Sequence, residues 1–538
     1  MKKWLLVALN AKYSHTSLSV RSISAYVKKH GFSNLSFIEL TINDGYFSIL
    51  EKIINEAPDY VGFSTYIWNI ELVKRLISDI KSINPKIKIF SGGPEVSYNK
   101  NVFKEIPQLD FIIRGEGEIP VLKLLKGEER IQGVCYSDNE YNFSEIEDMD
   151  NIPFVYEEEL EALKNRAVYY ETSRGCPFKC AFCISSLTKG VRTLPLDRVF
   201  KEIDRFSEAG IKRVKLVDRT FNFDKKRAKE IVEYILGKKR ETCFHFEIGA
   251  DLLDDEMLEL LNFAPYDTIQ LEAGIQSTNP ESLRLCNRTT DMDLLKSNLL
   301  KLKESKIRIH LDLIAGLPLE DFESFKKSFN EAYEMAPKVL QVGFLKLLHG
   351  SLLREMKEEY EYKFLNIAPY EILSNKYISF TELMKIKKVD NSVDAYLNSG
   401  IFKNSLKYIL ENKKIAPFDF YYNLGEIMGD KKLSLKDKFK ILHVLYGEDK
   451  ELSEYLKLDY VIKERGAIPD FFNNYKTKEN ITLVNEFLRE KGAEALKLND
   501  KYNNFIKYID FEIFEFESRK YLYLINRKSG GYTILELN

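Results

Sequence analysis

The feature that most restricts the fold of this chain is an alternation of short apolar runs with amphipathic helical stretches, which occurs twice along the sequence. In residues 1–135 the apolar runs are WLLVAL (4–9), LSFIEL (35–40), YVGFSTY (60–66), IKIFSGG (87–93) and LDFIIRG (109–115). Apolar residues at helical spacing fill the stretches between them. Such alternation is typical of a doubly wound parallel sheet, so we predict a flavodoxin-like α/β domain over residues 1–135.

The alternation restarts after residues 136–165, an acidic segment without apolar periodicity that we interpret as a linker. In residues 166–375 the strand candidates are VYYETSRG, RVKLVDRT, CFHFEIGAD, TIQLEAGIQS, IRIHLDLIAGLP and VLQVGFLKLL. Six such units are fewer than the eight of a full (βα)₈ barrel. We therefore predict a partial (βα)6 barrel in this part of the chain.

Residues 376–538 have a different pattern, with helical segments rich in Lys, Tyr and Asn. The last strand candidates are FEIFEFES, KYLYLIN and a run after a Gly-Gly turn, SGGYTILEL. We predict a mostly α-helical domain that ends in a small β element. No catalytic motif was found in its sequence.

The composition limits the classes of partner. Lys and Arg total 80 against 82 Asp and Glu, so the net charge of −2 gives no overall footprint for nucleic acid or an anionic membrane. No run of 18 apolar residues occurs, and the run Trp4–Leu9 is too short for a signal peptide. Six cysteines are too few for a disulfide scaffold, and Cys135, Cys243 and Cys286 are interpreted as core residues. We predict a cytoplasmic protein without membrane or nucleic-acid partners.

The other three cysteines form the strongest motif. RGCPFKCAFC places Cys176, Cys180 and Cys183 at C-x3-C-x2-C spacing. Four thiolates saturate a cubane iron–sulfur cluster, so three leave one iron open to another ligand. The alternative is a zinc ion completed by His245 or His310. Structural zinc usually has two paired ligand sets, and no second Cys/His pair occurs in the sequence, so a cluster is favoured.

With Phe182 before the third cysteine, this motif resembles the signature of the radical S-adenosylmethionine (SAM) superfamily. The resemblance implies a [4Fe–4S] cluster whose open iron is chelated by the amino and carboxylate groups of SAM. It also implies reductive cleavage of SAM to methionine and a 5′-deoxyadenosyl radical that abstracts hydrogen, with electrons from a donor such as flavodoxin or ferredoxin. The cysteines follow the first barrel strand, so we expect them at the carboxyl-end face.

The same resemblance implies SAM contacts at later strand ends. Asp218 in VDRTFN is expected to face the SAM amine, and Glu247 in FHFEIGADLL lies on the third strand. Relatives often read Phe-Glu-x-Arg there, whereas this chain has Gly249 in place of the arginine. The alternative for each residue is a hydrogen-bonded loop residue without a ligand.

Two further strand ends complete this set. Glu272 and Gln276 in LEAGIQS are expected near the ribose, and Gly316 in DLIAGLPLE near the adenine. Their joint position at successive strand ends behind the cysteines favours a SAM site over unrelated loop residues.

The N-terminal domain resembles the cobalamin-binding domains that precede many radical SAM barrels. The phrases NAKYSH, VGFSTY, SGGPE and RGEGE occupy the loop positions that line cobalamin in that family. Glycines there let the backbone approach a bulky ligand. The expected cobalamin-binding residues are Ser64, Thr65, Gly92, Gly93, Gly115 and Glu116.

Two alternatives were weighed for this domain. A dinucleotide or nucleotide site would need G-x-G-x-x-G after the first strand or G-x-x-x-x-G-K-[ST], and neither occurs. The other alternative is a sheet that only packs against the barrel. The Asp-x-His-x-x-Gly motif that supplies a lower cobalt ligand in some cobalamin proteins is absent, and His15 lacks that context. We therefore predict cobalamin without a histidine of this chain on its lower face.

The resemblance covers residues 1–375, and the remainder resembles an uncharacterised C-terminal domain, DUF4080-like, from which no function is carried over. It implies a cobalamin-dependent radical SAM methyltransferase that acts on an unactivated carbon of a small molecule or peptide. The alternatives are a cobalamin-dependent rearrangement, cyclisation or redox reaction, and a non-catalytic sensor of the cluster or cobalamin. No segment outside the cofactor motifs identifies the substrate.

Overall fold

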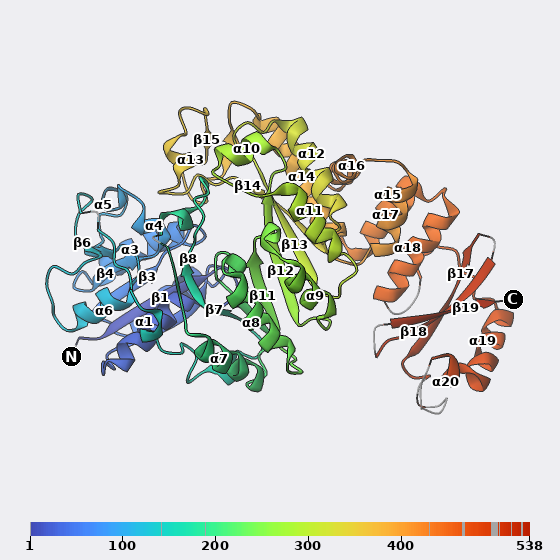
Figure 1. The fold of residues 1–538 in the computed structure, drawn as a ribbon, viewed down its shortest axis with the longest axis horizontal. Helices are drawn as coiled ribbons and strands as arrows, with labels where there is room; N and C mark the ends of the chain where they lie inside the picture. Colours follow the sequence, from blue (N-terminus) through green and yellow to red (C-terminus); the bar gives the residue numbers. More distant parts are fainter. Residues whose placement is uncertain are drawn as a thin grey trace. The chain divides into compact units, whose positions relative to one another are not determined.

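The computed structural model describes residues 2–140, 142–188, 190–429, 431–464, 468–496, 504, 506–517, 519–528 and 531–537. The chain divides into two compact units. The first comprises residues 1–337 and 342–383, and the second comprises residues 338–341 and 384–538. Figure 1 shows both, coloured along the sequence.

The N-terminal part of the first unit is built on a six-stranded sheet in the order β2-β1-β3-β4-β5-β6. Its strands are β1 (Trp4–Asn10), β2 (Leu35–Thr41), β3 (Tyr60–Ser64), β4 (Lys88–Gly92), β5 (Phe111–Ile113) and β6 (Val134–Cys135). The first five pair in parallel, and β6 is antiparallel to β5. The order 2-1-3-4-5 is that of flavodoxin-like sheets, so the predicted fold is confirmed.

Helices cover both faces of this sheet. They are α1 (Leu18–Lys29), α2 (Tyr46–Asn55), α3 (Ile70–Ile83), α4 (Pro94–Ser97), α5 (Val102–Glu105) and α6 (Glu118–Leu125). Leu5 and Val7 of β1 pack with residues of α2 and α3, whereas Leu6 and Ala8 pack with residues of α1 and α6. Every residue of β1 is buried. A parallel strand covered on both faces has to be continuously apolar, which explains the run in the sequence.

A second six-stranded sheet, in the order β14-β13-β12-β11-β10-β7, forms the predicted partial barrel. Its strands are β7 (Ala167–Tyr170), β10 (Arg213–Leu216), β11 (Cys243–Ile248), β12 (Ile269–Gln276), β13 (Arg308–Ala315) and β14 (Val339–Phe344). The pairs from β7 to β13 are parallel. Its helices are α7 (Leu196–Glu208), α8 (Lys225–Leu236), α9 (Asp255–Phe263), α10 (Pro280–Leu285), α11 (Met292–Lys301) and α12 (Phe322–Glu334).

Short elements extend the barrel at the carboxyl ends of its edge strands. The antiparallel strands β8 (Ser173–Gly175) and β9 (Val191–Thr193) follow β7. After β14 come α13 (Leu352–Glu355) and the antiparallel pair β15 (Lys363–Phe364) and β16 (Ile372–Ser374). Short 3₁₀ helices also occur in this part: η3 (Ile184–Leu187), η4 (Phe221–Phe223) and η5 (Ala250–Leu252).

The segment between the two sheets, residues 136–165, contains the 3₁₀ helices η1 (Met149–Asn151) and η2 (Leu160–Leu163). Met149 and Tyr156 are buried, with 2% and 1% of their surface exposed. The acidic sequence therefore forms little regular structure, yet its apolar residues pack against the protein rather than forming an exposed tether.

The second unit is mostly helical and ends in a three-stranded antiparallel sheet, as predicted. Its elements, with α14 crossing from the first unit, are α14 (Phe380–Tyr396), α15 (Lys403–Asn412), α16 (Pro417–Met428), α17 (Leu435–Tyr446), α18 (Lys450–Lys463), α19 (Lys478–Glu490), α20 (Gly492–Ala495), β17 (Ile509–Phe516), β18 (Arg519–Asn526) and β19 (Gly531–Leu537). Helix α18 packs on one sheet face and α19 on the other. Gly530 of the predicted Gly-Gly turn lies outside the described residues.

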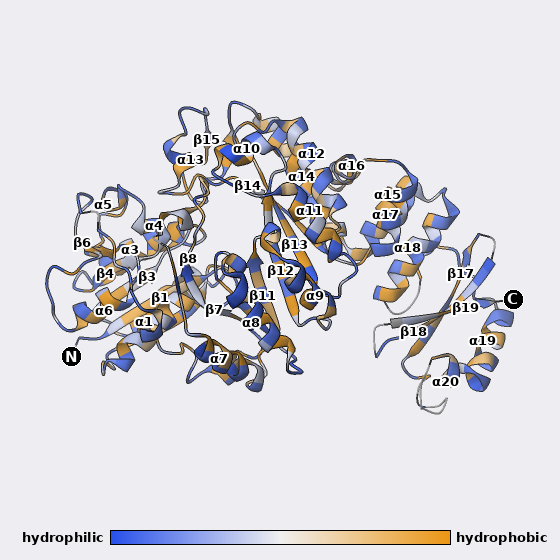
Figure 2. Cartoon of the chain, in the orientation of Figure 1, coloured by the Kyte–Doolittle hydropathy of each residue, from blue (hydrophilic) through white to orange (hydrophobic). Residues whose placement is uncertain are grey.

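Figure 2 shows the apolar character of the strands in the two parallel sheets. In the part of the chain that the structure describes, no helix has the length and hydropathy needed to cross a bilayer.

Candidate functional site

The three clustered cysteines lie in the loop of a β-hairpin at the carboxyl end of the first barrel strand. Strand β8 ends at Gly175, Cys176, Cys180 and Cys183 follow, and β9 returns antiparallel to β8. We call residues 173–193 the cysteine hairpin. Gly175 has a φ of +107° and lies so close to the carbonyl of Gly190 that a side chain would not fit. The hairpin therefore requires a glycine directly before the first cysteine.

Hydrogen bonds within the loop hold its shape. The backbone N–H of Cys176 donates to Oγ1 of Thr188 at 3.2 Å. The ammonium group of Lys179 donates to the carbonyls of Ser186 and Thr188 at 2.7 and 3.0 Å. All six cysteines of the chain are free thiols. The loop is thus fixed without a disulfide, and its thiols are available as ligands.

The guanidinium of Arg288 reaches this loop. Its Nη1 lies 3.9 Å from Sγ of Cys180, and its Nη2 donates to the carbonyl of Gly274. Burial raises the pKa of the Cys180 thiol, and Arg288 opposes that shift because it favours the thiolate. Clusters are held by thiolates, so Arg288 supports the form of Cys180 that a cluster requires.

A cavity of about 250 Å³ opens beside the cysteine hairpin at the carboxyl ends of the barrel strands. Cys180 lines it, together with three predicted SAM contacts, Glu247, Glu272 and Gln276. The other lining residues are Phe178, Arg219, Thr220, Ile248, Gly249, Asp251, Gly274, Arg288, Thr289, Thr290 and Asp312. The structure therefore brings one of the three predicted cluster cysteines and three of the five predicted SAM residues to one place.

Carboxylates outnumber cations on the lining. The acidic side chains are Glu247, Asp251, Glu272 and Asp312, and the guanidinium groups are those of Arg219 and Arg288. Partly buried charges of one sign attract a ligand of the opposite sign. The cavity therefore suits a cationic ligand such as a sulfonium.

Glu272 is shared by two basic side chains inside the barrel, those of Lys215 and His245. Its Oε2 lies 3.1 Å from Nζ of Lys215 and 2.8 Å from Nε2 of His245. The hydrogen bond from His245 is the largest cause that lowers the pKa of Glu272 to about 2, so this carboxylate stays ionised. The imidazole of His310 lies 5.5 Å from that of His245. Among the described residues, no three His, Cys, Asp or Glu side chains surround a single metal position.

Asp312 on β13 behaves differently from Glu272. Burial, followed by the charges of Glu272 and Glu247, raises the pKa of Asp312 to about 7, although Lys215 opposes the shift. Burial also raises the pKa of Glu247, which lies 3.8 Å from Lys215. The cavity thus combines a permanently charged carboxylate with carboxyl groups that exchange protons closer to neutral pH.

Asp218 does not line the cavity. It is 1% exposed and accepts hydrogen bonds from the backbone N–H groups of Thr172 and Ser173 at 2.8 and 3.1 Å, and from the Thr172 hydroxyl. Burial raises the pKa of Asp218 to about 6. These residues connect β7 to the cysteine hairpin, so Asp218 supports the hairpin. Its contact with the SAM amine stays a prediction.

Gly249 occupies the position where relatives often carry an arginine. Its N–H donates to Oδ1 of Asn222 at 2.9 Å, and its carbonyl accepts from Nδ2 of the same residue at 2.8 Å. Arg219 and Arg288 line the same cavity from other segments. The guanidinium groups that could bind a carboxylate are therefore present, at positions outside the motif.

Gly316 follows β13 with a φ of +93°, and a Cβ there would lie 2.7 Å from Cδ1 of Ile372. Its carbonyl accepts hydrogen bonds from the hydroxyl of Tyr362 at 3.1 Å and the amide of Asn375 at 3.0 Å. Packing within the protein thus requires the glycine. The predicted adenine contact at Gly316 is not on the cavity lining.

Four of the six predicted cobalamin residues lie at the carboxyl ends of β3 and β4. The hydroxyl of Ser64 lies 2.9 Å from that of Ser19, and the buried hydroxyl of Thr65 donates to the carbonyl of Gly92 at 2.6 Å. Gly93 has a φ of +105°, and a Cβ on it would lie 2.5 Å from the carbonyl oxygen of Thr65. The ends of β3 and β4 are therefore hydrogen-bonded to each other. The close approach of the Thr65 backbone is enough to require a glycine at position 93, without any ligand.

The end of β5 is tied to the cysteine hairpin. Gly115, with a φ of +83°, packs against the backbone of Ser144. Oε1 of Glu116 lies 2.7 Å from Nη2 of Arg192, and its Oε2 lies 3.1 Å from Nη1 of Arg174. The carboxylate predicted to face cobalamin is thus held by two arginines of the hairpin.

An aromatic pair is accessible at the same edge of the N-terminal sheet. The rings of Tyr66 and Trp68 stack with centroids 4.3 Å apart, and Trp68 is 44% exposed. The indole N–H of Trp68 donates to the carbonyl of Leu9 at 3.1 Å, which fixes the ring at the end of β1. A flat apolar surface therefore lies beside the hydroxyl groups of Ser19 and Ser64.

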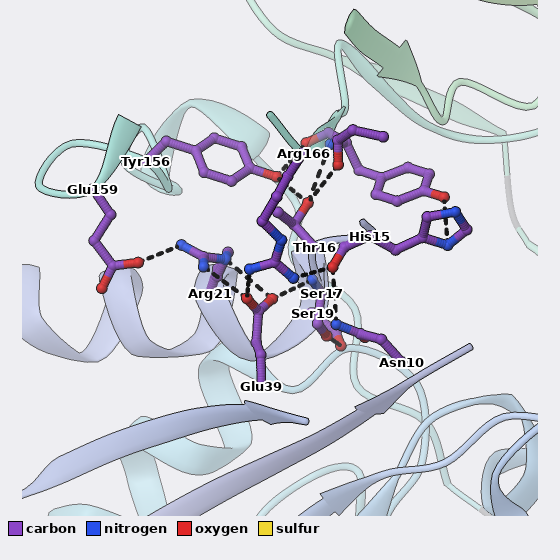
Figure 3. A network of polar contacts seen from close by, with 12 residues as sticks. Asn10, His15, Thr16, Ser17, Ser19, Arg21, Glu39, Tyr156, Glu159 and Arg166 are labelled. Atoms are coloured by element: carbon purple, nitrogen blue, oxygen red, sulfur yellow. Dashed lines mark hydrogen bonds and ion pairs between the residues drawn. The ribbon is translucent and has the colours of Figure 1, made fainter. Parts of the chain in front are cut away.

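Figure 3 shows the polar network that joins the N-terminal sheet to the first barrel strand. Glu39 binds Arg21 at 2.8 Å and Arg166, the residue before β7, at 3.0 Å. Arg21 also binds Glu159 at 2.9 Å. Arg21 and Glu39 are only 4% and 6% exposed, so this junction is shielded from water.

His15 lies at this junction and faces the barrel. It forms an isolated parallel bridge with Ala167, and its Nδ1 lies 3.4 Å from the hydroxyl of Tyr169. Burial, followed by the charge of Lys12, lowers the pKa of His15. The imidazole therefore lies against β7. This position agrees with the prediction that His15 does not bind cobalt, which stays a prediction.

The other edge of the barrel also contacts the N-terminal domain. The hydroxyl of Tyr370, in the segment after β14, donates to Oε2 of Glu95 at 2.8 Å. In the same segment, the N–H of Leu353 donates to the carbonyl of Ala181 in the cysteine hairpin at 3.0 Å. Strands β7 and β14 are the two edges of the barrel sheet. The N-terminal domain therefore contacts the barrel next to both edge strands.

Three protein families match consecutive parts of the chain. The B12 binding domain matches residues 4–125, the Radical SAM superfamily matches residues 170–332, and the protein of unknown function DUF4080 matches residues 358–535. Residues 170–332 therefore form a radical SAM domain. The barrel, cysteine hairpin and cavity are those of this domain, and the sheet in front of them is a B12-binding domain.

Relatives match this chain over most of its length. An uncharacterized methyltransferase of Pyrococcus horikoshii is 26% identical over 381 residues, which are 66% of this chain and 80% of that protein. An anaerobic magnesium-protoporphyrin IX monomethyl ester cyclase of Rubrivivax gelatinosus is 25% identical over 453 residues, 78% of this chain and 79% of that protein.

A solved structure matches the fold. The cobalamin-dependent S-adenosylmethionine radical enzyme OxsB, with aqua-cobalamin and S-adenosylmethionine bound, has a TM-score of 0.61 and 17% identity to this chain. The match covers 94% of this chain and 78% of OxsB. The fold of nearly the whole chain is therefore similar to that of a known structure.

Sequence reasoning missed several residues of this site. Arg219 directly follows Asp218 in the VDRTFN segment, so its place at a strand end could have indicated it, whereas Arg288 lies on a loop with no motif. Asp312 lies two residues after His310 on the same inward face of β13, so strand alternation could have identified it. Arg174 is the first residue of RGCPFKCAFC, but the sequence gives no indication of its ion-pair partners.

Proposed function

We propose that this protein is a cobalamin-dependent radical SAM enzyme that transfers a methyl group to an unactivated carbon. The observation that carries the proposal is the cysteine hairpin, which opens on an acidic cavity and is bonded to the strand ends of the B12-binding domain. The methyltransferase from Pyrococcus horikoshii supports methyl transfer.

The donor set fits a cluster. Cys176, Cys180 and Cys183 offer three thiolates on one loop, and each thiolate of a cubane cluster binds a different iron. One iron then stays open for a chelating ligand from the adjacent cavity. Lys179 and the hairpin hydrogen bonds would hold the loop in place, and Arg288 would stabilise the thiolate of Cys180.

The cavity fits SAM. Its excess of carboxylates complements a sulfonium, with Glu247 and Glu272 on neighbouring strands in register. Arg288 or Arg219 would bind the SAM carboxylate in place of the arginine that Gly249 replaces. Gln276 would remain for the ribose, as expected from its place at the end of β12.

The edge of the N-terminal sheet fits a large planar ligand. Trp68 and Tyr66 present an apolar face, and the hydroxyls of Ser19 and Ser64 can bond to amide groups at its rim. His15 is held against Tyr169, which supports our prediction that no histidine of this chain ligates the lower face of cobalt.

When bound, the cluster, SAM and cobalamin supply electron transfer, a hydrogen-abstracting radical and a methyl group that can leave homolytically. The protein's own residues position these groups and exclude water. Glu39, Arg21 and Arg166 would close one side of the junction, and Tyr370 with Glu95 the other. We further propose a low-potential donor such as flavodoxin or ferredoxin, and a cytoplasmic location, because such a cluster needs a reducing environment.

Replacing Glu272 with Ala is expected to weaken SAM binding. The change removes a partly buried carboxylate and leaves Lys215 and His245 without their shared partner, so the cavity becomes less favourable for a cation. A loss of ~1–3 kcal/mol corresponds to a rise of about 5- to 150-fold in Kd. Titration of SAM into the anaerobic protein would measure it. Glu256→Ala, at a 72% exposed ion pair, is the control, and equal affinity in both variants would place SAM elsewhere.

SAM affinity is expected to rise with pH up to about pH 7. Asp312 has a pKa of about 7, and a cationic ligand favours its ionised form. If SAM lowers that pKa by about one unit, affinity rises about threefold between about pH 6 and pH 7, and about tenfold in total from well below pH 6 to well above pH 7. The stability of the protein without SAM has the opposite pH dependence. The free energy of unfolding falls as the pH rises between the normal aspartate pKa and about 7, because the folded state binds the Asp312 proton more tightly than the unfolded state does.

The measurement is the Kd for SAM from about pH 6 to about pH 8 in wild type and Asp312→Asn. The asparagine variant should show a much smaller pH dependence, because the Asp312 carboxyl group is absent while the neighbouring Glu272, Glu247 and Lys215 remain. An unchanged slope in this variant would assign the pH dependence to another group.

The proposed function is tested with SAM that carries deuterium in its methyl group. Reduced protein loaded with iron, sulfide and hydroxocobalamin is incubated with extract of cells that lack the gene, and products are analysed by mass spectrometry. Methyl transfer predicts 5′-deoxyadenosine together with a metabolite that gains the labelled methyl group. Absence of both products would reject an enzymatic radical function and leave the sensor.

A second candidate is a cobalamin-dependent rearrangement, cyclisation or redox reaction. The relative from Rubrivivax gelatinosus, a cyclase, favours it because that match covers 78% of this chain. In the same experiment this candidate predicts that 5′-deoxyadenosine is formed. It also predicts that no metabolite gains the deuterated methyl group of SAM.

A further inference from the structure

Two arginines tie the cysteine hairpin to the N-terminal domain, one from each strand of the hairpin. Arg174 of β8 lies 3.1 Å from Oε2 of Glu116 and 3.1 Å from Oε1 of Glu118. Arg192 of β9 lies 2.7 Å from Oε1 of Glu116. We call these four residues the arginine clasp.

The clasp is shielded from water. Its side chains are between 5% and 18% exposed, so its ion pairs are screened less than those on the surface. Arg192 also donates to the carbonyl of Ile146, and Glu118 accepts from the hydroxyl of Ser22 at 2.7 Å. Each side of the clasp is therefore held by a further hydrogen bond to a neighbouring segment. The planar fork of a guanidinium fixes direction as well as distance.

The clasp lies on a short path between the two cofactor sites. On one side it ends in β8 and β9, which carry Cys176, Cys180 and Cys183 in their loop. On the other side Glu116 follows Gly115 at the strand-end edge of the B12-binding domain, and Glu118 begins α6. A displacement of the hairpin relative to that edge would have to break these contacts.

We infer that Arg174 and Arg192 are positioning residues that set the distance between the cluster and cobalamin. This inference rests on the proposed function, because it requires both cofactors to be bound. A radical generated at the cluster side has to form close to the methyl group that it receives, and displacements of the order of 1 Å already cost much of the rate in positioned reactions. The clasp acts through the hairpin and touches no reacting atom.

The test is the distance between the two paramagnetic centres in the full-length protein. Protein loaded with iron, sulfide and hydroxocobalamin is reduced to the paramagnetic cluster and cob(II)alamin, and their dipolar coupling is measured by pulsed electron paramagnetic resonance. Arg192→Gln and Arg174→Gln are each expected to broaden or shift the single distance seen in wild type. Arg192→Lys, which keeps the charge, should restore most of the wild-type distribution.

Arg198→Gln is the matched control. Arg198 is 19% exposed and binds Glu202 and Asp150 at 2.8 and 3.0 Å, but neither partner belongs to the cysteine hairpin or to residues 1–135. Its distance distribution should equal that of wild type. Wild-type distributions in both Arg192→Gln and Arg174→Gln would overturn the inference while leaving the proposed function intact. Failure of the wild-type protein to hold cobalamin would instead overturn the proposed function and this inference with it.

Discussion

Replacing Cys176, Cys180 and Cys183 together with alanine is expected to remove the bound iron and sulfide and to abolish SAM cleavage. These thiols are the three cysteines of the hairpin loop, and each would ligate a different iron. Without them no cluster is available to reduce SAM. Iron and sulfide analysis of anaerobically purified protein, together with chromatography of 5′-deoxyadenosine, measures both losses.

A variant with Cys135→Ala and Cys243→Ala is the control, since both are buried free thiols outside the hairpin. It should retain iron and sulfide at the wild-type ratio and form 5′-deoxyadenosine. Full retention of iron in the triple variant, or stoichiometric zinc in the wild-type protein, would contradict the cluster assignment and favour the zinc alternative.

The strands of both sheets were predictable because parallel strands are covered on both faces. Their sequences are therefore continuous apolar runs, such as the fully buried β1. The observed ends are shorter than the predicted runs at β3 and β5, which stop at Ser64 and Ile113. Beyond these points the chain leaves the sheet to form the polar strand-end loops.

The carboxylates on the barrel strands were predictable because the carboxyl ends of parallel strands meet at one edge of the sheet. Glu247 and Glu272 lie opposite each other in the parallel register, so placing both strands correctly brought both carboxylates to one cavity. Asp218 shows the limit of this reasoning. It also follows a barrel strand, but its carboxylate turns towards Thr172 and Ser173 instead of the cavity.

The contacts between domains could not be derived from the sequence. Glu116 and Arg192 are 76 positions apart, and Glu39 and Arg166 are 127 positions apart. Each residue taken alone is an ordinary surface charge, and only the packing of the two sheets makes the pair. The cobalamin expectation for Glu116 rested on strand-end position, whereas its arginine partners depend on where the cysteine hairpin folds.

Replacing Glu39 with Ala is expected to lower the stability of the first unit by ~3–5 kcal/mol, because one carboxylate neutralises two arginines at the domain junction. Arg21 is 4% exposed and Arg166 is 18% exposed, so neither can recover its hydration fully when Glu39 is lost. The pKa of Glu39 is lowered by the hydrogen bond and charge of Arg21 despite burial. This contribution to stability is therefore present above the normal glutamate pKa and is lost as the pH falls through the lowered value.

The matched control for this prediction lies in the same network (Figure 3). Glu159→Ala makes the same chemical change at a carboxylate that also binds Arg21 at 2.9 Å but is 52% exposed. It should cost no more than ~1 kcal/mol, since water replaces the lost partner. Thermal unfolding gives the difference, and hydrogen exchange localises it. Glu39→Ala should speed exchange in residues 10–19 and 166–170, because Arg166 also holds the carbonyl of His15. Equal midpoints for the two variants would show that the network does not fix residues 10–19 to the first barrel strand.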